Sequence, residues 1–65
     1  MENLRTYYAS LKRGGKREFC MSVASELQMS ASSVINWCNG WCRPSDKRAL
    51  EVLSRHSGIA VENLY

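Results

Sequence analysis

The sequence predicts a small all-α fold, a compact five-helix bundle in one domain that covers residues 1–65. Two observations carry this prediction. Apolar residues recur along the chain at i, i+3, i+4 and i+7, which is the spacing of one face of an α-helix. No stretch shows the alternation of apolar and polar residues that a half-buried strand requires. A chain of 65 residues has room for one core and little interior for a catalytic cleft.

The opening helix is expected from about Glu2 to Lys12. Its apolar stripe consists of Leu4, Tyr7, Tyr8 and Leu11. We interpret the tyrosines as core residues with solvated hydroxyls rather than as a platform for stacked bases. Gly14-Gly15 is expected to end this helix, with one glycine in the left-handed conformation.

Two helices joined by a tight turn follow, over about residues 17–40. The first is expected over about 17–28, with its apolar stripe at Cys20, Val23, Ala24 and Leu27. The turn falls at residues 28–30, where Ser30 is a suitable N-cap for a helix over 31–39. That helix has Val34, Trp37 and Cys38 as its apolar stripe, and Asn39-Gly40 supplies a left-handed stop. This is a helix-turn-helix pattern.

The last third of the chain predicts one longer helix and a short closing one. Ser45 or Asp46 is expected to cap the fourth helix, and Ser57-Gly58 to end it. Its buried face consists of Ala49, Val52, Leu53 and His56. A final helical turn over residues 60–65 would return Val61 and Leu64 to the core.

The outward side of the third helix carries short hydrogen-bonding groups. Ser32, Asn36 and Asn39 lie at i, i+4 and i+7, roughly opposite the apolar stripe. An Asn amide can bond an adenine edge with two hydrogen bonds, and a serine hydroxyl can donate or accept. No Asp or Glu occurs from residue 27 to residue 45, so nothing there would repel DNA phosphates. The alternative is an ordinary polar helix face.

The densest cationic cluster in the chain brackets Gly14-Gly15 and consists of Lys12, Arg13, Lys16 and Arg17. The net charge is +3 and the pI about 9.0, both compatible with a polyanionic partner. Lys16 and Arg17 are expected at the start of the second helix, where the helix dipole disfavours positive charge. A docked phosphate would resolve that conflict. The alternative is a solvated loop without a partner.

Other classes of function have weaker support. No apolar run approaches the ~18 residues of a membrane span, and no signal-peptide core precedes the first helix, so a cytoplasmic protein without membrane contact is expected. An odd number of cysteines favours reduced thiols. A zinc site could draw on Cys20, Cys38, Cys42 and His56, but no C-x2-C pair is present. We expect no metal, no cofactor, no catalytic residue and no enzymatic activity.

The chain resembles the phage repressor and Cro family of helix-turn-helix regulators, also called XRE-like. The resemblance depends on a series of residues at family spacing: Val23, Ala24, Leu27, Met29, Ser30, Val34, Trp37, Gly40, Pro44 and Ser45. It implies a lambda-repressor-like five-helix bundle that binds double-stranded operator DNA, usually palindromic, as a homodimer. The protein would then be a small phage- or plasmid-like transcriptional regulator.

Carried over by position, the resemblance implies roles for several residues in and just after the third helix. Ala31, Ser32 and Asn36 fall where the family reads bases, with Ser33 and Ile35 as flanking candidates. Asn39 and Arg43 fall where it contacts phosphates. Independently of the resemblance, the charge of Lys12, Arg13, Lys16 and Arg17 makes them further candidates for phosphate contacts.

The chain departs from the family at two positions of this motif. Gln28 stands where the family prefers glycine, so the turn must tolerate a strained side chain or adopt another geometry. Cys38 stands where the family usually has glutamate. Both departures weaken the transfer of individual base contacts.

Two alternative functions remain open at this stage. The chain is also similar to MerR-like and excisionase-type winged-helix DNA binders, which follow the motif with a β-wing. A protein-interaction module that does not bind DNA is the other alternative, with Ile35 and Trp41 as an exposed apolar patch. Salt dependence separates these classes, because phosphate contacts weaken steeply as salt rises and apolar contacts do not.

Overall fold

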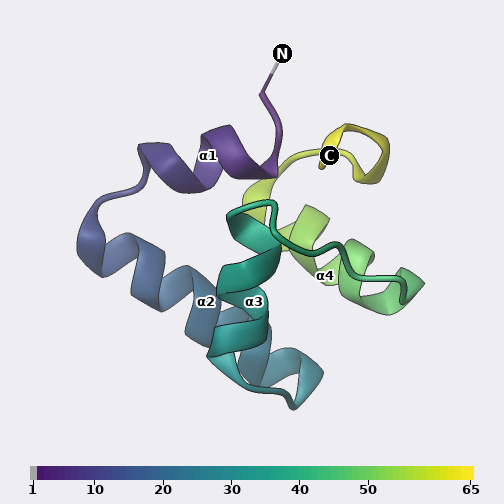
Figure 1. The fold of residues 1–65 in the computed structure, drawn as a ribbon, viewed down its shortest axis with the longest axis horizontal. Helices are drawn as coiled ribbons and strands as arrows, with labels where there is room; N and C mark the ends of the chain where they lie inside the picture. Colours follow the sequence, from purple (N-terminus) through teal and green to yellow (C-terminus); the bar gives the residue numbers. More distant parts are fainter. Residues whose placement is uncertain (1) are drawn as a thin grey trace.

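The computed structural model describes residues 2–65, and Met1, the first residue of the predicted domain, lies outside them. Residues 2–65 form four α-helices and one 3₁₀ turn within 28 × 27 × 20 Å, and Figure 1 shows how the helices are arranged. The elements are α1 (Leu4–Ser10), α2 (Arg13–Leu27), α3 (Ala31–Cys38), α4 (Lys47–Ser57) and η1 (Val61–Asn63). Residues 2–65 contain no strand. The all-α prediction is confirmed, and the segment expected as a fifth helix is a single 3₁₀ turn.

α1 is shorter than predicted at both ends. It covers Leu4–Ser10, whereas the sequence predicts a helix from about Glu2 to Lys12. Asn3 caps it, because the Asn3 side chain accepts from the Thr6 N–H and the Thr6 hydroxyl accepts from the Asn3 N–H, both at 2.9 Å. Its C-cap, Leu11, has an extended backbone with φ −74° and ψ 146°. The predicted end at Lys12 and the left-handed glycine cap are therefore wrong.

α2 begins at Arg13, four residues earlier than predicted, and both glycines lie inside its first turn. Glycine is tolerated there because the first turn makes few intrahelical hydrogen bonds, so little regular structure is lost. A Cβ at Gly15 would lie 3.8 Å from the Leu11 Cβ, so this residue sits against the preceding segment. The chain thus passes from α1 to α2 at residues 11–12, before the glycine pair.

The turn between α2 and α3 is left-handed at Gln28, with φ 56° and ψ 49°. Among residues 2–65, Gln28 is the only non-glycine residue with positive φ. The Met29 N–H donates to the Ala24 carbonyl at 2.9 Å, which closes the end of α2. The expectation that this turn tolerates a strained side chain is confirmed.

The residues at the ends of α3 and α4 cap these helices as predicted, with one exception. Ser30 has the extended backbone of an N-cap, but its hydroxyl lies 3.4 Å from the Ser33 hydroxyl and makes no capping bond to the backbone. Gly40 is left-handed after α3, which ends one residue before the predicted boundary. Asp46 caps α4 by accepting from the Arg48 N–H at 3.0 Å.

The core lies where α2 packs against both α3 and α4. Its largest fully buried side chains are Leu4, Leu53, Leu64, Val23, Val34, Val52, Cys20 and Cys38. Tyr7, Tyr8 and Trp37 are partly buried and pack against this cluster. The Leu4 N–H donates to the Leu64 carbonyl at 2.9 Å, so the first helix and the C-terminal segment meet on one side of the molecule (Figure 1).

Within residues 2–65, no helix has the length and apolar character that crossing a membrane requires. The residues that follow Pro44 form α4 and η1 rather than a β-wing. The winged-helix alternative therefore lacks its defining element in the part of the chain that the structure describes.

Candidate functional site

α3 has one buried face and one accessible face. Val34 and Cys38 are fully buried on the inner face, and Trp37 packs against the core beside them. Ser32 and Ile35 are exposed on the other side, with Asn36 partly exposed. Because α3 has eight residues, its length is about 12 Å at 1.5 Å per residue. The accessible face is therefore short and carries no charged side chain.

The structure distinguishes among the residues predicted to read bases. Ser32 and Ile35 are the most accessible, and Ile35 keeps 37% of its surface exposed. Ala31 and Ser33 are partly buried, and the Ser33 hydroxyl lies next to that of Ser30. The Asn36 carbonyl accepts from the Trp41 N–H at 3.1 Å, which ties the following loop to α3. Of the five predicted residues, Ser32 and Ile35 therefore lie on the accessible face, whereas Ala31, Ser33 and Asn36 are partly buried.

Two of the predicted phosphate contacts are already engaged within the protein. The Asn39 amide donates to the Ile35 carbonyl at 3.0 Å, so it serves the end of its own helix. The Arg43 guanidinium lies 5.3 Å from the centre of the Tyr65 ring, within cation–π distance. Either residue would have to give up or share this contact in order to bind a phosphate.

The cationic cluster lies along the first turn and a half of α2. Arg13 is the first helical residue, and Lys16 and Arg17 lie one turn further in, so they are not at the helix start as predicted. Lys12, Arg13 and Arg17 are exposed. Lys16 is partly buried, with its Nζ 5.5 Å from the centre of the Tyr8 ring. Both ion pairs found within residues 2–65 use Glu26, so no carboxylate pairs with this cluster there.

An open groove of about 470 Å³ joins the cationic cluster to α3. Its lining comes from α1, the first half of α2 and the start of α3: Tyr8, Arg13, Lys16, Arg17, Cys20, Met21, Ala31 and Ile35. Two predicted base-reading residues and three predicted phosphate-binding residues thus share one concave surface. Lys12, Ser32, Ser33 and Asn36 are not part of its lining.

Sequence reasoning did not single out Met21 for this surface. Met21 lies one position off the buried stripe of α2 and keeps 53% of its surface exposed. The sequence signal that could have indicated this role is that Met21 is apolar although it lies outside the buried stripe. Tyr8 was predicted as a core residue, and its hydroxyl accepts from the Cys20 thiol, with 3.7 Å between oxygen and sulfur.

Tyr8, Tyr65 and Cys38 hold their protons at neutral pH. Burial, together with the neighbouring Cys20, raises the pKa of Tyr8 to about 12. Burial likewise raises the pKa of Tyr65 to about 12 and that of the Cys38 thiol above its ordinary value. These groups therefore add no negative charge to the groove or to α3 near pH 7.

The cysteines do not come together with His56 as a metal site. Cys20 and Cys38 are buried in the core, whereas Cys42 is exposed on the loop after α3. Residues 2–65 contain no group of three or more His, Cys, Asp or Glu side chains arranged to hold a metal ion. The zinc alternative has no geometric support in the described part of the chain.

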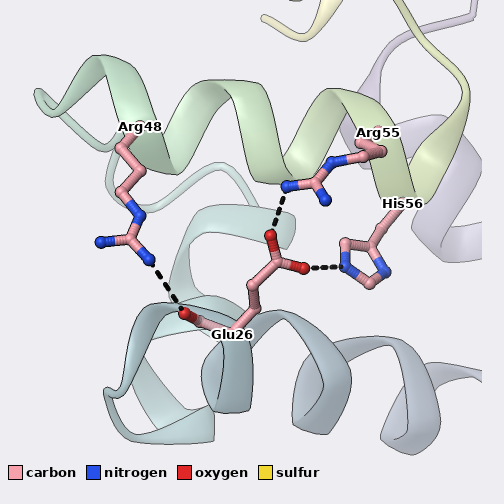
Figure 2. A network of polar contacts seen from close by, with 4 residues as sticks. All are labelled: Glu26, Arg48, Arg55 and His56. Atoms are coloured by element: carbon pink, nitrogen blue, oxygen red, sulfur yellow. Dashed lines mark hydrogen bonds and ion pairs between the residues drawn. The ribbon is translucent and has the colours of Figure 1, made fainter.

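A separate polar network joins the C-terminal end of α2 to α4, away from the cationic cluster (Figure 2). One carboxylate oxygen of Glu26 accepts from the Arg55 guanidinium, and the other lies 3.0 Å from the His56 Nε2. Arg48 reaches the Glu26 backbone carbonyl at 3.4 Å. The His56 hydrogen bond, followed by Arg55, lowers the pKa of Glu26. Hence Arg48 and Arg55 of α4 both contact Glu26 of α2.

No protein-family model, curated protein or solved structure matches this chain. A function must therefore be inferred from the chain itself. Its two most distinctive features are the uncharged accessible face of α3 and the nearby cations that have no carboxylate partner within residues 2–65. They lie on adjoining helices, and Ala31 and Ile35 of α3 line one groove together with Arg13, Lys16 and Arg17.

Proposed function

We propose that this protein binds double-stranded DNA, with α2 and α3 as a helix-turn-helix of the repressor and Cro type. The supporting observation is the pairing of an uncharged accessible helix face with three neighbouring cations that have no carboxylate partner within residues 2–65. α3 enters the major groove, while Arg13, Lys16 and Arg17 contact the phosphate backbone. One DNA duplex would thus contact both the uncharged face of α3 and the three cations of α2.

The side chains of α3 favour A·T base pairs. Asn36 carries an amide that can bond adenine at N6 and N7. Ile35 and Ala31 present methyl groups that can pack on the thymine methyl. The Arg and Lys side chains that usually read guanine are missing from α3. The preferred half-site therefore centres on adenine and thymine rather than on guanine.

A helix of about 12 Å reads only a few base pairs, so one copy offers limited specificity. Two copies on a palindromic site would double the number of readable contacts and fix the spacing of the half-sites at about one helical turn. The loop after α3 presents Trp41, which is 76% exposed and available to a second copy. The protein would act as a small DNA-binding regulator that works as a dimer on its site.

Selection of bound sites from a random duplex pool tests this function directly. We expect enriched sites to contain two related A·T-centred half-sites, and binding to weaken steeply as salt rises. Enrichment of no sequence, with binding that is insensitive to salt, would remove DNA from the proposal. It would favour instead an apolar protein partner at Trp41.

Matched variants then assign the roles. Asn36→Ala should cost on the order of 1–3 kcal/mol on the selected site and relax its base preference. Arg17→Ala should weaken binding to all sequences alike and reduce the salt slope by about one unit. Arg55→Ala removes the same charge from the α4 network and serves as the control, with little effect expected on the salt slope. A loss with Arg17→Ala on the selected site alone would contradict its phosphate role.

A further inference from the structure

The groove beside α3 contains more apolar surface than a DNA phosphate contact requires. Phosphate recognition uses charged and hydrogen-bonding groups, which Arg13, Lys16 and Arg17 supply. The apolar part of the lining, which we call the floor, is different: Tyr8 offers ring surface, Met21 offers thioether surface, and Cys20, which is buried, completes it. Met21 is 53% exposed and would stay exposed beside a docked phosphate. The floor is therefore suited to an apolar ligand.

The cations and the apolar floor belong to the same concave surface. Lys and Arg side chains can cover apolar surface with their aliphatic stems and keep their charged groups at the water boundary. Lys16 places its ammonium over the Tyr8 ring, with Nζ 5.5 Å from the ring centre, so one cation of the groove already contacts its apolar part. No Asp or Glu lines the groove, so an anion would meet positive charge without a competing carboxylate. The volume of about 470 Å³ lies in the range of about 300–1,000 Å³ that small-molecule sites occupy.

We propose that this groove binds a small amphiphilic anion, of which a medium-chain fatty carboxylate is the simplest form. The carboxylate pairs with Arg13, Lys16 and Arg17 at the edge. The alkyl chain lies along Tyr8, Met21 and Ile35. The unbranched Met21 side chain has several rotatable bonds and a polarizable sulfur, which suits it to packing against a flexible chain.

A single dissolved molecule suits this surface better than a membrane does. The apolar residues line a groove of about 470 Å³, about the size of one small ligand, whereas insertion into a bilayer requires an apolar face that protrudes. The same charges would also attract anionic headgroups, so vesicles are needed as a separate arm of the test.

This ligand would also regulate the proposed DNA contact, an extension that rests on the proposed function. The carboxylate would engage the three cations assigned to DNA phosphates, and the chain would cover Ile35 on the accessible face of α3. Both ligands cannot use the same charges at once, so each must weaken the binding of the other by an equal factor. The amphiphile would release the protein from DNA.

Titration of the full chain with decanoate, without DNA, tests the site. Decanoate is added below its micelle concentration while amide and methyl NMR signals are followed. We expect saturable shifts confined to the groove residues, with much weaker binding of decanol and of acetate, which lack the charge and the chain respectively. Equal binding of decanol, or shifts that are spread over the whole protein, would overturn the proposal. Binding to anionic phospholipid vesicles but not to decanoate would overturn it in favour of a membrane surface.

Single substitutions test the cations and the apolar floor of the groove separately. Arg17→Gln should weaken decanoate binding about tenfold, as expected for loss of one charge-assisted hydrogen bond. Met21→Glu places a carboxylate on the floor and should abolish binding. Val61→Glu makes the same exchange at an exposed apolar residue outside the groove and should reduce binding little. Unchanged affinity in Met21→Glu, with a folded spectrum, would contradict the assigned floor.

A competition experiment follows only if both ligands bind. Decanoate should displace a labelled selected duplex from the original protein and fail to do so from Met21→Glu. Simultaneous binding without displacement would overturn the regulatory extension. Because the decanoate titration contains no DNA and the site selection contains no decanoate, failure of one proposal is distinguishable from failure of the other.

Discussion

The two ends of α2 use positive charge in opposite ways. Near its N-terminal end, Arg13, Lys16 and Arg17 have no carboxylate partner within residues 2–65. Near its C-terminal end, Glu26 receives the Arg55 guanidinium and lies beside His56, both from α4 (Figure 2). Cations opposite a carboxylate help to hold helices together. Cations without such a partner remain available to an anion from outside.

This difference shows why the net charge alone is a poor guide to the site. Four of the nine Lys and Arg residues lie within residues 12–17, whereas the chain as a whole carries only +3. Exposed ion pairs contribute little to stability, so pairing Arg55 with Glu26 adds little to the fold. It does remove Arg55 from the cations that an external ligand can use.

The largest expected effect is a loss of stability on replacing Phe19, which lies between the two ends of α2. The Phe19 ring centre lies 6.5 Å from that of Tyr8 towards the cationic end and 6.5 Å from that of His56 towards the Glu26 end. Phe19→Ala should lower the free energy of unfolding by about 3–5 kcal/mol, which is a large share of the total for a small domain. Urea denaturation followed by circular dichroism measures this loss. Phe19→Leu should lose much less, and a loss below about 1 kcal/mol in Phe19→Ala would show that Phe19 does not support both ends.

A smaller effect is expected where α2 ends. Relief of the left-handed conformation at Gln28 is worth about 1–2 kcal/mol, and glycine adds about 0.5–1 kcal/mol of backbone entropy cost. Gln28→Gly should therefore raise the free energy of unfolding by about 0.5–1 kcal/mol. Thermal and urea unfolding measure it, with Gln28→Ala as the control that keeps the strain and gains nothing. Destabilisation by Gln28→Gly would mean that the Gln28 side chain itself stabilises the turn.

The smallest expected effect concerns the pH dependence of the Glu26 network. The pKa of Glu26 is lowered in the folded protein, first by the His56 hydrogen bond and then by Arg55. Its contribution to stability is therefore present above the ordinary value of 4.5 and is lost as the pH falls through the lower folded-state pKa. Glu26→Gln should flatten the acid side of the stability profile, measured by urea unfolding at a series of pH values.

Glu51 supplies the control for this measurement, because it is an exposed glutamate of α4 that forms no ion pair within residues 2–65. Glu51→Gln should leave the acid side of the profile nearly unchanged. Equal flattening by Glu51→Gln and Glu26→Gln would show that the overall charge, rather than the network, sets the pH dependence.

Local sequence signals were reliable where one short-range interaction dominates. Asp46 caps α4 and Gly58 ends it with φ 77°, because a side-chain acceptor and a residue without Cβ act within one turn of chain. The buried stripe of α2 at Cys20, Val23 and Ala24 was also predicted, since helical spacing alone determines which side chains share a face. The signal failed at Gly14-Gly15, which lie in the first turn of α2 rather than after α1 and do not have the positive φ of a left-handed cap.

By itself, the amino-acid sequence determined the all-α class, the buried stripes and the neutral outer side of α3, all of which follow from residue spacing along one helix. The tertiary structure alone decided that Met21 and Tyr8 share a groove with Arg17, and that Glu26 faces Arg55 twenty-nine residues away. Spacing along the chain says nothing about which face of one helix meets another. That choice depends on how all the buried side chains fit together at once.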